Sequence, residues 1–465
     1  MNTPDHRPNV LYIHSHDTGR YIQPYGFAVP TPNLQRLAEQ GALFRQAFCG
    51  NPTCSASRAV LLTGQSAHAN GMIGLAHRGF RLNDPRHLLP HTLRAAGFHT
   101  ALAGVQHVAS HVDMPDDLPG RIGYDERLQR EGRTTEQVVD DFLRRPPRQP
   151  FFLDVGFVET HRVFPDPAPA DDPRYLRPPL PLPDTPETRR DMAAYHTLAR
   201  RLDARMGAVL ASLDARGLAG NTLVICTTDH GIAFPAMKCN LTDHGLGVML
   251  ILRGPDGAAA RGADPAWRAL RGGAVCDELV SHVDVFPTLC DLLGLTPPPW
   301  LEGRSLGPWL RGETSSHRDE VFGEVNVHVN VEPQRTVRTK RWRYIRRYGR
   351  RPRPDLPNCD ASPSKDLWMA AGWADRPLPA ETLHDLVFDP CEAANAAGDP
   401  ANRGVLEDLR GRLDRWMRET GDPLCEGRLR IPAGARLGKP GARHVEQGDV
   451  VLDRAMTWPD DFEDA

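Results

Sequence analysis

Short apolar segments alternate with amphipathic helical segments along the first two thirds of the chain, and this alternation restricts the possible folds more than any other feature. The apolar segments have no polar face, which is typical of strands that are buried on both sides of a sheet. Helices between such strands predict a mostly parallel sheet covered by helices. The expected strands are NVLYI (9–13), TALAG (100–104), FFLDVGFV (151–158), TLVICTT (222–228) and VMLILR (248–253).

The pattern changes at about residue 318, where basic and aromatic segments replace the apolar ones. We therefore predict an α/β fold with two domains, a catalytic domain at 1–318 and a smaller α+β domain at 319–465. The second domain would hold antiparallel strands, a helix and a Gly/Pro-rich tail. The expected helices are 31–41, 91–97, 191–217, 283–295 and 402–421, and the basic strands lie at 335–349.

Charge and cysteine content exclude several functions. The net charge of −3 gives no basic field for nucleic acid, and runs such as VMLIL are far shorter than the roughly 18 residues of a membrane span. The N-terminal MNTPDHRPNVLYI enters a strand without a signal segment. Nine cysteines without a CxxC pair argue against a disulfide framework and a structural zinc site. We expect a cytoplasmic protein with no membrane or nucleic-acid partner. The sequence leaves open whether the chain forms a homo-oligomer.

Carboxylates and imidazoles follow four of the expected strands. In open α/β sheets, ligands bind beyond the carboxyl ends of the strands. A single Asp or His there is most often a cap or a turn residue, but four strands that bring such groups to one edge favour a site. The residues are His16 and Asp17 after the first strand, His107 after the second, His161 after the third, and Asp229 and His230 after the fourth.

The types of these side chains suggest two separate roles, metal binding and catalysis. His16, Asp17, Asp229 and His230 offer the oxygen and nitrogen ligands of one divalent cation. The other two imidazoles, with Lys238 in AMKCN, would serve an anionic substrate and proton transfer.

Cys54 opens a helical segment in NPTCSASRAVLLTG (51–64), and Arg58 follows it. The unpaired N–H groups at a helix start favour an anion, so the thiol stands where an anionic group would bind. From position alone, a buried cysteine that acts as a small hydrophobe is an equal alternative. A thiol phosphatase loop would place its Cys and Arg further apart.

CSASR followed by LLTG resembles the signature Cys-x-(Pro/Ala)-Ser-Arg of the formylglycine-dependent sulfatases, which have an alkaline phosphatase-like fold. TPNLQRLAEQGALFRQAF before it and HANGMIGL after it fit the same register. ETHR, TDHGIAFP and LHDLVFDPCEAAN are most similar to the sulfamidase branch, the N-sulfoglucosamine sulfohydrolases. The resemblance runs from about residue 8 to residue 425.

The resemblance implies a role for each matching residue. Cys54 is converted to formylglycine by a formylglycine-generating enzyme, and the hydrate attacks sulfur and contacts the metal. Arg58 holds the hydrate, and His107 is the base that expels sulfate. His161 and Lys238 bind the sulfuryl oxygens or protonate the leaving group. The physical chemistry agrees, because a hydrate can release sulfate by returning to the aldehyde, and a plain serine or cysteine ester cannot.

Two metal ligands depart from the family pattern. His16-Asp17 stands in place of Asp-Asp, and Asp229-His230 stands in place of Asp-Asn. The second variant also occurs in related phosphonate and phosphodiester hydrolases. Calcium is the family's usual ion, but two imidazoles make manganese or zinc plausible.

A third departure concerns the sulfate. Val105 replaces the family's lysine two positions before His107, which removes one sulfate contact, while His161, Arg162 and Lys238 remain. The first hypothesis is a sulfatase, a hydrolase that cleaves an O-sulfate or N-sulfonate of a sulfated sugar. The second is a phosphonate monoester or phosphodiester hydrolase on the same scaffold. The third is a non-catalytic anion-binding relative, against which the intact catalytic set argues.

Three segments are expected to wall the substrate: HRGFRLND (77–84), the proline-rich 164–186 and NVHVN (326–330). Two interpretations of His77 and His328 stay open. They are either solvated loop histidines or residues that contact the substrate, and the first is at least as well supported. The basic RTKRWRYIRRYGRRPR is interpreted as a solvated strand face in preference to a saccharide-binding surface.

Overall fold

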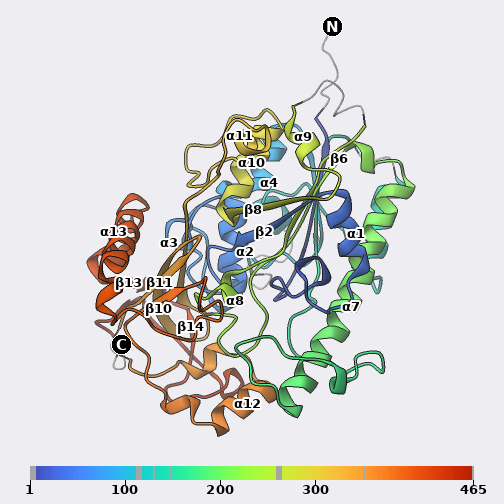
Figure 1. Cartoon of the computed structure of the whole chain (residues 1–465). Coiled ribbons are helices and arrows are strands. Elements are labelled where there is room, and N and C mark those ends of the chain that lie inside the picture. The colour runs from blue at the N-terminus through green and yellow to red at the C-terminus, as the bar shows by residue number, and fades with distance from the viewer. Residues whose placement is uncertain are drawn as a thin grey trace.

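A large sheet of eight strands forms the centre of the computed structural model (Figure 1). The structure describes residues 7–110, 118–128, 131–145, 148–257, 264–349 and 351–462. In this part of the chain the strand order is β4-β3-β5-β1-β6-β7-β2-β8, and β7 alone runs antiparallel to its neighbours. The strands are β1 (Asn9–Ser15), β2 (Ala42–Phe48), β3 (His99–Gly104), β4 (Glu126–Leu128), β5 (Phe151–Gly156), β6 (Thr222–Thr228), β7 (Leu250–Arg253) and β8 (Ala274–Ser281).

Helices cover both faces of this sheet, as the alternation predicted. Along β1, Leu11 and Ile13 pack into one core while Val10 and Tyr12 pack into the other, because successive side chains of a strand point to opposite faces. The first core is shared with α1 (Pro32–Gln40), α6 (Thr135–Arg144) and α7 (Pro186–Ala215), and the second with α2 (Cys54–Thr63), α4 (Leu89–Ala95) and α10 (Val285–Leu292). The predicted α/β class is confirmed.

Several elements were not expected from the sequence. Strands β2 and β8 carry charged or polar residues in mid-strand, among them Arg45 and Glu278, and so lack the continuous apolar run of the central strands. The shorter helices are α3 (Ala67–Asn70), α5 (Leu118–Arg121), α8 (Asp243–Leu246), α9 (Ala266–Ala269), α11 (Gly307–Leu310) and α12 (Pro363–Ala370). Among the described residues no helix is both long and apolar enough to cross a membrane.

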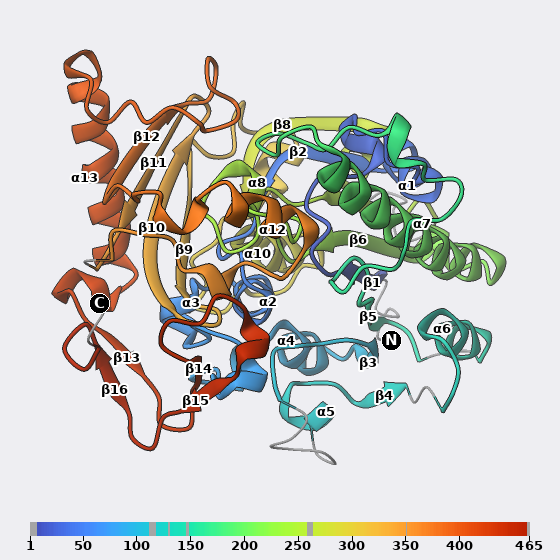
Figure 2. The same cartoon turned by 90° about the horizontal axis from the view of Figure 1, so that it is seen from below.

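A second, antiparallel sheet lies beside the first, with α13 (Arg403–Glu419) along its outer side (Figure 2). The boundary expected after residue 318 falls just before its first strand. The strand order is β12-β11-β10-β9, with β9 at Glu320–Val327, β10 at Val331–Thr339, β11 at Trp342–Arg347 and β12 at Glu381–Asp385. The tail forms two ribbons, β13 (Leu429–Ile431) with β16 (Met456–Trp458) and β14 (Arg436–Gly438) with β15 (Asp449–Val451).

The prediction of a solvated face for the basic run 338–353 was wrong for two of its arginines. Arg338 and Arg343 are buried, whereas Lys340 and Arg341 are exposed. Arg338 pairs with Asp243 at 2.9 Å, and Arg343 pairs with Glu392 at 2.6 Å. Carboxylates from distant parts of the chain therefore neutralise charges that look exposed in the local sequence.

Candidate active site

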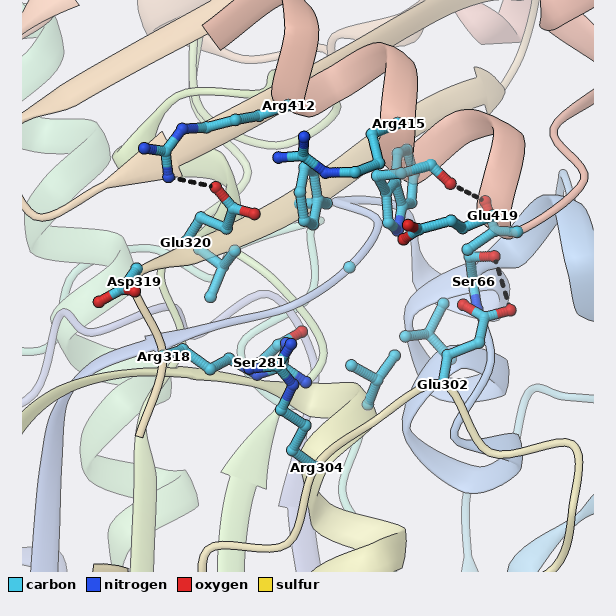
Figure 3. A pocket seen from close by; sticks show the side chains of 17 residues that line it. Ser66, Ser281, Glu302, Arg304, Arg318, Asp319, Glu320, Arg412, Arg415 and Glu419 are labelled. Carbon is cyan, nitrogen blue, oxygen red and sulfur yellow. Dashed lines mark hydrogen bonds and ion pairs between the residues drawn. The ribbon is translucent and has the colours of Figure 1, made fainter. Parts of the chain in front are cut away.

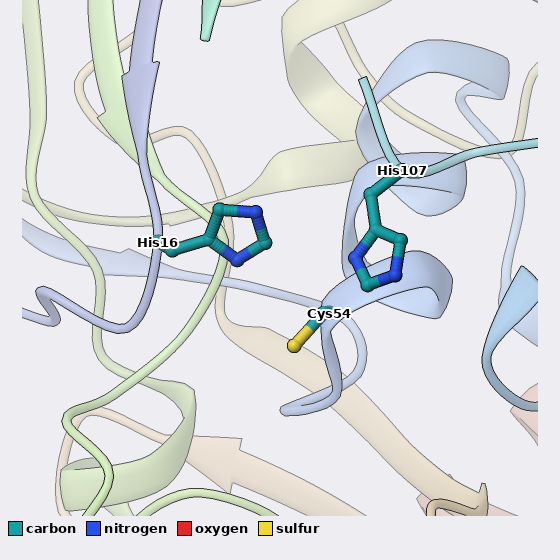
Figure 4. Close-up of side chains that lie close together, drawn as sticks. All are labelled: His16, Cys54 and His107. Carbon is teal, nitrogen blue, oxygen red and sulfur yellow. The ribbon is translucent and has the colours of Figure 1, made fainter. Parts of the chain in front are cut away.

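The carboxyl ends of β1, β3, β5 and β6 lie at one edge of the large sheet, because these strands are adjacent and parallel. Helix α2 begins at Cys54 at the same edge. Figure 4 shows Cys54 at the start of this helix near the rings of His16 and His107, and one ligand atom of each of the three residues lies within 4.8 Å of the others. Four of the five predicted metal ligands each offer one atom to a cluster in which all atoms lie within 4.8 Å of one another: His16, Asp17, Cys54 and Asp229.

The donors of this cluster fit a divalent cation. Nδ1 of buried His16 has no hydrogen-bond partner of good geometry among the described residues, although Asp229 Oδ2 lies 3.1 Å away. Burial lowers the pKa of His16 to about 4, which keeps a ring nitrogen free to coordinate. Burial alone would raise the pKa of Asp17, but the Lys238 ammonium holds it below its ordinary value. The cluster therefore offers one imidazole and two carboxylates in ionic form.

His230, the fifth predicted ligand, stands beside the cluster. Its Nε2 lies 3.4 Å from the Cys54 sulfur and 3.4 Å from Asp17 Oδ1, while its Nδ1 lies 3.0 Å from the carbonyl oxygen of Gly231. Burial disfavours the charged ring, but the Asp229 and Asp17 carboxylates outweigh it and raise the pKa of His230 to about 9. His230 thus presents Nε2 to the thiol and to the same carboxylates.

Arg58 lies one turn after Cys54 on α2 and is buried. Its Nη2 donates to the carbonyl oxygen of Ser15 at 2.9 Å and to Asp229 Oδ2 at 3.1 Å. Its Nη1 lies 2.5 Å from Nδ1 of His14, a residue that sequence reasoning missed. The guanidinium therefore neutralises one carboxylate of the cluster and is fixed from two sides.

His107 presents one free ring nitrogen to the cluster. Its Nε2 lies 3.0 Å from Nδ1 of His77, and the two rings stack at 5.2 Å. Its Nδ1 is buried without a hydrogen-bond partner in the described structure, and the ring centroid lies 5.6 Å from that of His16. Burial, then the neighbouring His16, holds the pKa of His107 well below its ordinary value. A neutral imidazole of this kind can accept a proton.

His161 comes from the segment after β5, and its ring lies 5.6 Å from that of His16. We predicted that the next residue, Arg162, faces the cluster, but it does not. Its guanidinium forms a bidentate pair with Asp191 of α7, with both N–O distances at 2.8 Å, and its Nε donates to the carbonyl oxygen of Ala233. Arg162 therefore fixes the loop of His161 and holds no substrate.

Lys238 lies between two carboxylates, Asp17 on the cluster side and Asp360 on the other. Sequence reasoning missed Asp360, because it follows no strand of the large sheet. His328 is 5% exposed, so its interpretation as a solvated loop residue is wrong. Burial, then the charge of Lys238, lowers the pKa of His328 to about 3.

The backbone of three residues at the site adopts a left-handed conformation that side chains other than glycine disfavour. The φ angles are 51° at Asp17, 58° at His107 and 64° at Cys239, next to Lys238. Each costs on the order of 1–3 kcal/mol unless the surroundings enforce it. Such residues concentrate at functional sites, where the fold fixes a side chain in a direction that a regular element would not give.

A separate cavity of about 510 Å³ lies behind α2, between α13 and β9 (Figure 3). Its described lining includes none of the predicted site residues. Arg412 pairs with Glu320 at 2.7 Å, and Glu302 accepts hydrogen bonds from Ser66. Charged side chains of both signs line it, so we assign no ligand to it.

Comparison with solved structures shows what this fold is. The phosphonate monoester hydrolase of Agrobacterium radiobacter matches with a TM-score of 0.66 and 21% identity, over 89% of this chain and 96% of that one. BT4656, solved in complex with its substrate D-glucosamine-2-N,6-O-disulfate, matches with a TM-score of 0.65 and 18% identity, over 90% and 99%. The fold of this chain is therefore the one that these two proteins share.

The family follows from the sequence comparisons. The sulfatase family model matches residues 8–295, and the model described as N-sulphoglucosamine sulphohydrolase, C-terminal, matches residues 267–365. The human N-sulphoglucosamine sulphohydrolase is 32% identical, over 89% of this chain and 91% of its own length. The chain belongs to the sulfatase family, the hydrolases of sulfuric esters, and the resemblance seen in its motifs is confirmed.

Proposed function

We propose that this protein hydrolyses an O-sulfate or an N-sulfonate of a sugar through a formylglycine formed from Cys54. The observation that carries the proposal is the position of the Cys54 thiol. It stands at the N-terminus of α2, inside a cluster of metal-binding atoms, and one helical turn before Arg58, which pairs with Asp229 of the same cluster. A cysteine that served only to fill the core would not need either neighbour.

A metal ion fits the donors, and His16, Asp17 and Asp229 would hold it, with His230 beside them. Calcium suits the carboxylates, while the imidazoles also suit manganese or zinc. When present, the metal and the formylglycine hydrate would supply positive charge and a nucleophilic oxygen.

The other residues act on the sulfuryl group and on protons. Arg58 fixes the group at position 54 and neutralises Asp229. His107, neutral and with a free Nδ1, accepts a proton as sulfate leaves. His161 and Lys238 hold the sulfuryl oxygens or deliver a proton to the leaving group, since His161 lies beside His16 and Lys238 pairs with Asp17.

A sugar-sized substrate agrees with the surface next to His107. His77 lines a hollow of about 900 Å³ between loop 77–84 and the C-terminal ribbons, and Arg430 and Arg436 line it too. Arginines at such a wall suit an acidic saccharide. The names of the relatives agree, because one is a sulphohydrolase of N-sulphoglucosamine and a structural neighbour binds a glucosamine disulfate.

A second candidate is hydrolysis of a phosphonate monoester or phosphodiester. The Asp229-His230 pair and the neutral Val105 favour it, because the sulfuryl group lacks one cation here. The deciding experiment compares kcat/KM for an O-sulfate, an N-sulfonate, a phosphodiester and a phosphonate monoester. We expect the sulfated sugars to be preferred, with measurable side activity on the phosphorus substrates. Preference for a phosphorus substrate by orders of magnitude would favour the second candidate.

A further inference from the structure

Asp360 contacts the site from the second sheet's side of the molecule. Its Oδ2 lies 3.1 Å from Lys238 Nζ, and Asp17 Oδ2 lies 3.0 Å from the same nitrogen. The Asp17 side chain is fully buried, whereas the Asp360 side chain is 19% exposed. Lys238 therefore separates a carboxylate that faces the metal-binding cluster from one that a ligand can reach.

The backbone near Asp360 is tied to the end of β9. The side-chain oxygen of Asn358 accepts hydrogen bonds from the backbone N–H groups of Val329 and Asn330, both at 2.9 Å. These residues follow His328, so the bonds bring the Asp360 segment and the buried imidazole together. A second-sheet segment thus completes the wall of a site built on the large sheet.

A buried lysine fixes the same segment from its other side. Lys365 is fully buried, and its ammonium donates to the carbonyl oxygens of Leu356 and Cys359 at 2.8 and 2.7 Å. It also donates to the carbonyl of Arg443 at 2.8 Å. Asp360 therefore stands on a rigid turn and holds its position before a ligand arrives, which is what recognition requires.

Asp360 lies next to a cation. The Lys238 ammonium is 3.1 Å from its Oδ2. Burial raises the pKa of Asp360, but Lys238 and then His328 outweigh it and hold that pKa below its ordinary value. A negative carboxylate next to the place of a sulfuryl anion opposes binding, unless the ligand brings a donor of its own.

We propose that Asp360 accepts a hydrogen bond from the nitrogen of an amino sugar, either the N–H of an N-sulfonate or the ammonium of the product. The inference rests on the proposed sulfatase function and narrows it to N-sulfonated amino sugars. Lys238 binds the sulfuryl group on one side of the scissile bond. Asp360, which lies beyond Lys238 from the cluster, binds the nitrogen on the other side of that bond. An O-sulfate offers no proton at the bridging atom for Asp360 to accept.

The alternative is that Asp360 only orients Lys238. Removal of the carboxylate would then lower kcat/KM equally for every substrate, because Lys238 would act on the sulfuryl group that all of them share. The two roles are separated by comparing a substrate that has nitrogen bonded to sulfur with one that has oxygen there.

The kinetic test compares Asp360→Asn and Asp360→Ser with the wild type on N-sulfoglucosamine and on 4-nitrophenyl sulfate. We expect kcat/KM for the N-sulfonate to fall by about 10- to 100-fold, the usual effect of a lost charged hydrogen bond, and the aryl sulfate to change by less than about threefold. Equal losses on both substrates would overturn the inference. A wild type that cleaves neither would overturn the proposed function instead.

A binding test does not depend on turnover. In a Cys54→Ala background, calorimetry should show glucosamine binding at least about tenfold more tightly than glucose, and Asp360→Asn should abolish that preference. Asp375→Asn is the matched control, because that carboxylate is 75% exposed and pairs with Arg353. Equal affinity for the two sugars with Asp360 intact would overturn the inference, whatever the enzyme hydrolyses.

Discussion

Arg58 and His14 share a hydrogen bond directly behind Cys54, with 2.5 Å between Nη1 and the imidazole Nδ1. Because arginine only donates, Nδ1 accepts, and the ring's Nε2 therefore donates to Asp154 Oδ1 at 2.8 Å. Burial and the charge of Arg58 lower the pKa of His14, which agrees with a neutral ring. Tyr124 donates to the other carboxylate oxygen of Asp154. One buried chain of hydrogen bonds thus fixes Arg58, which lies one helical turn after Cys54.

Replacement of His14 by Phe should destabilise the protein and misplace Arg58. The ring volume is kept, but a guanidinium N–H and a carboxylate oxygen lose their partner in the core. We expect the free energy of unfolding in urea to fall by about 2–4 kcal/mol. His99→Phe is the control, since His99 is partly exposed and pairs with Glu126, so its loss should stay below about 1 kcal/mol. Equal effects of the two changes would show that the buried chain adds nothing.

Replacement of His16 by Ala should weaken metal binding. Nδ1 of His16 lacks a hydrogen-bond partner of good geometry in the described structure and faces Asp229, which is expected of a ligand. Loss of groups that merely orient ligands costs 10- to 100-fold in affinity, so loss of a ligand should cost at least about tenfold. Elemental analysis of protein dialysed against limiting metal measures it, with His87→Ala as the control. Unchanged occupancy would mean that this imidazole is not a ligand.

Replacement of Cys54 by Ser should leave the fold intact and stop turnover. Serine has nearly the same volume, but its sulfate ester lacks the route of release through an aldehyde. We expect kcat to fall on the order of 10³-fold or more, with leaving group released in at most one equivalent per chain. Multiple turnover at the wild-type rate would exclude the formylglycine route.

The pair of His68 and Glu324 should make stability depend on pH. Nδ1 of His68 lies 3.0 Å from Glu324 Oε1, and both side chains are buried. Burial disfavours the charged imidazole, but the Glu324 carboxylate outweighs it and raises the pKa of His68. The folded state therefore binds the proton more tightly than the unfolded state. This stability is fully present below the unfolded pKa and is lost as pH rises through the folded one.

The test measures the thermal unfolding midpoints of the wild type and of His68→Gln from about pH 6 to about pH 8 and follows the difference between them. The difference should shrink as pH rises, because only the wild type loses the proton. A difference that stays constant or grows would show that His68 is neutral in the folded protein.

The sequence predicted the parts of the site that follow from strand direction. His16, His107, His161 and Asp229 meet because parallel strands bring their carboxyl ends to one edge, which can be deduced from the pattern alone. Asp360 could not be found this way. It lies on an irregular turn whose position depends on hydrogen bonds to residues about 30 positions away.

The core of the second sheet was misjudged for a related reason. Arg343 looks solvated in a run of basic residues, and only the folded chain brings Glu392 to it. Strand β7 was expected as a strand, but a short apolar segment has the same composition in either direction, so its antiparallel orientation could not be predicted. Patterns of one segment predict its type, whereas charge pairing and direction depend on partners elsewhere in the chain.

The account's central claim is that Cys54 becomes formylglycine, and trypsin offers a direct measurement. Cleavage after Arg45 and Arg58 releases residues 46–58, which contain both Cys49 and Cys54. Cys49 is an internal control that the modification does not touch. In active protein produced with a formylglycine-generating enzyme, alkylation before mass spectrometry should label one thiol in this peptide. The fragments should assign the label to Cys49 and an aldehyde to position 54. Two alkylated cysteines in a fully active preparation would contradict the claim.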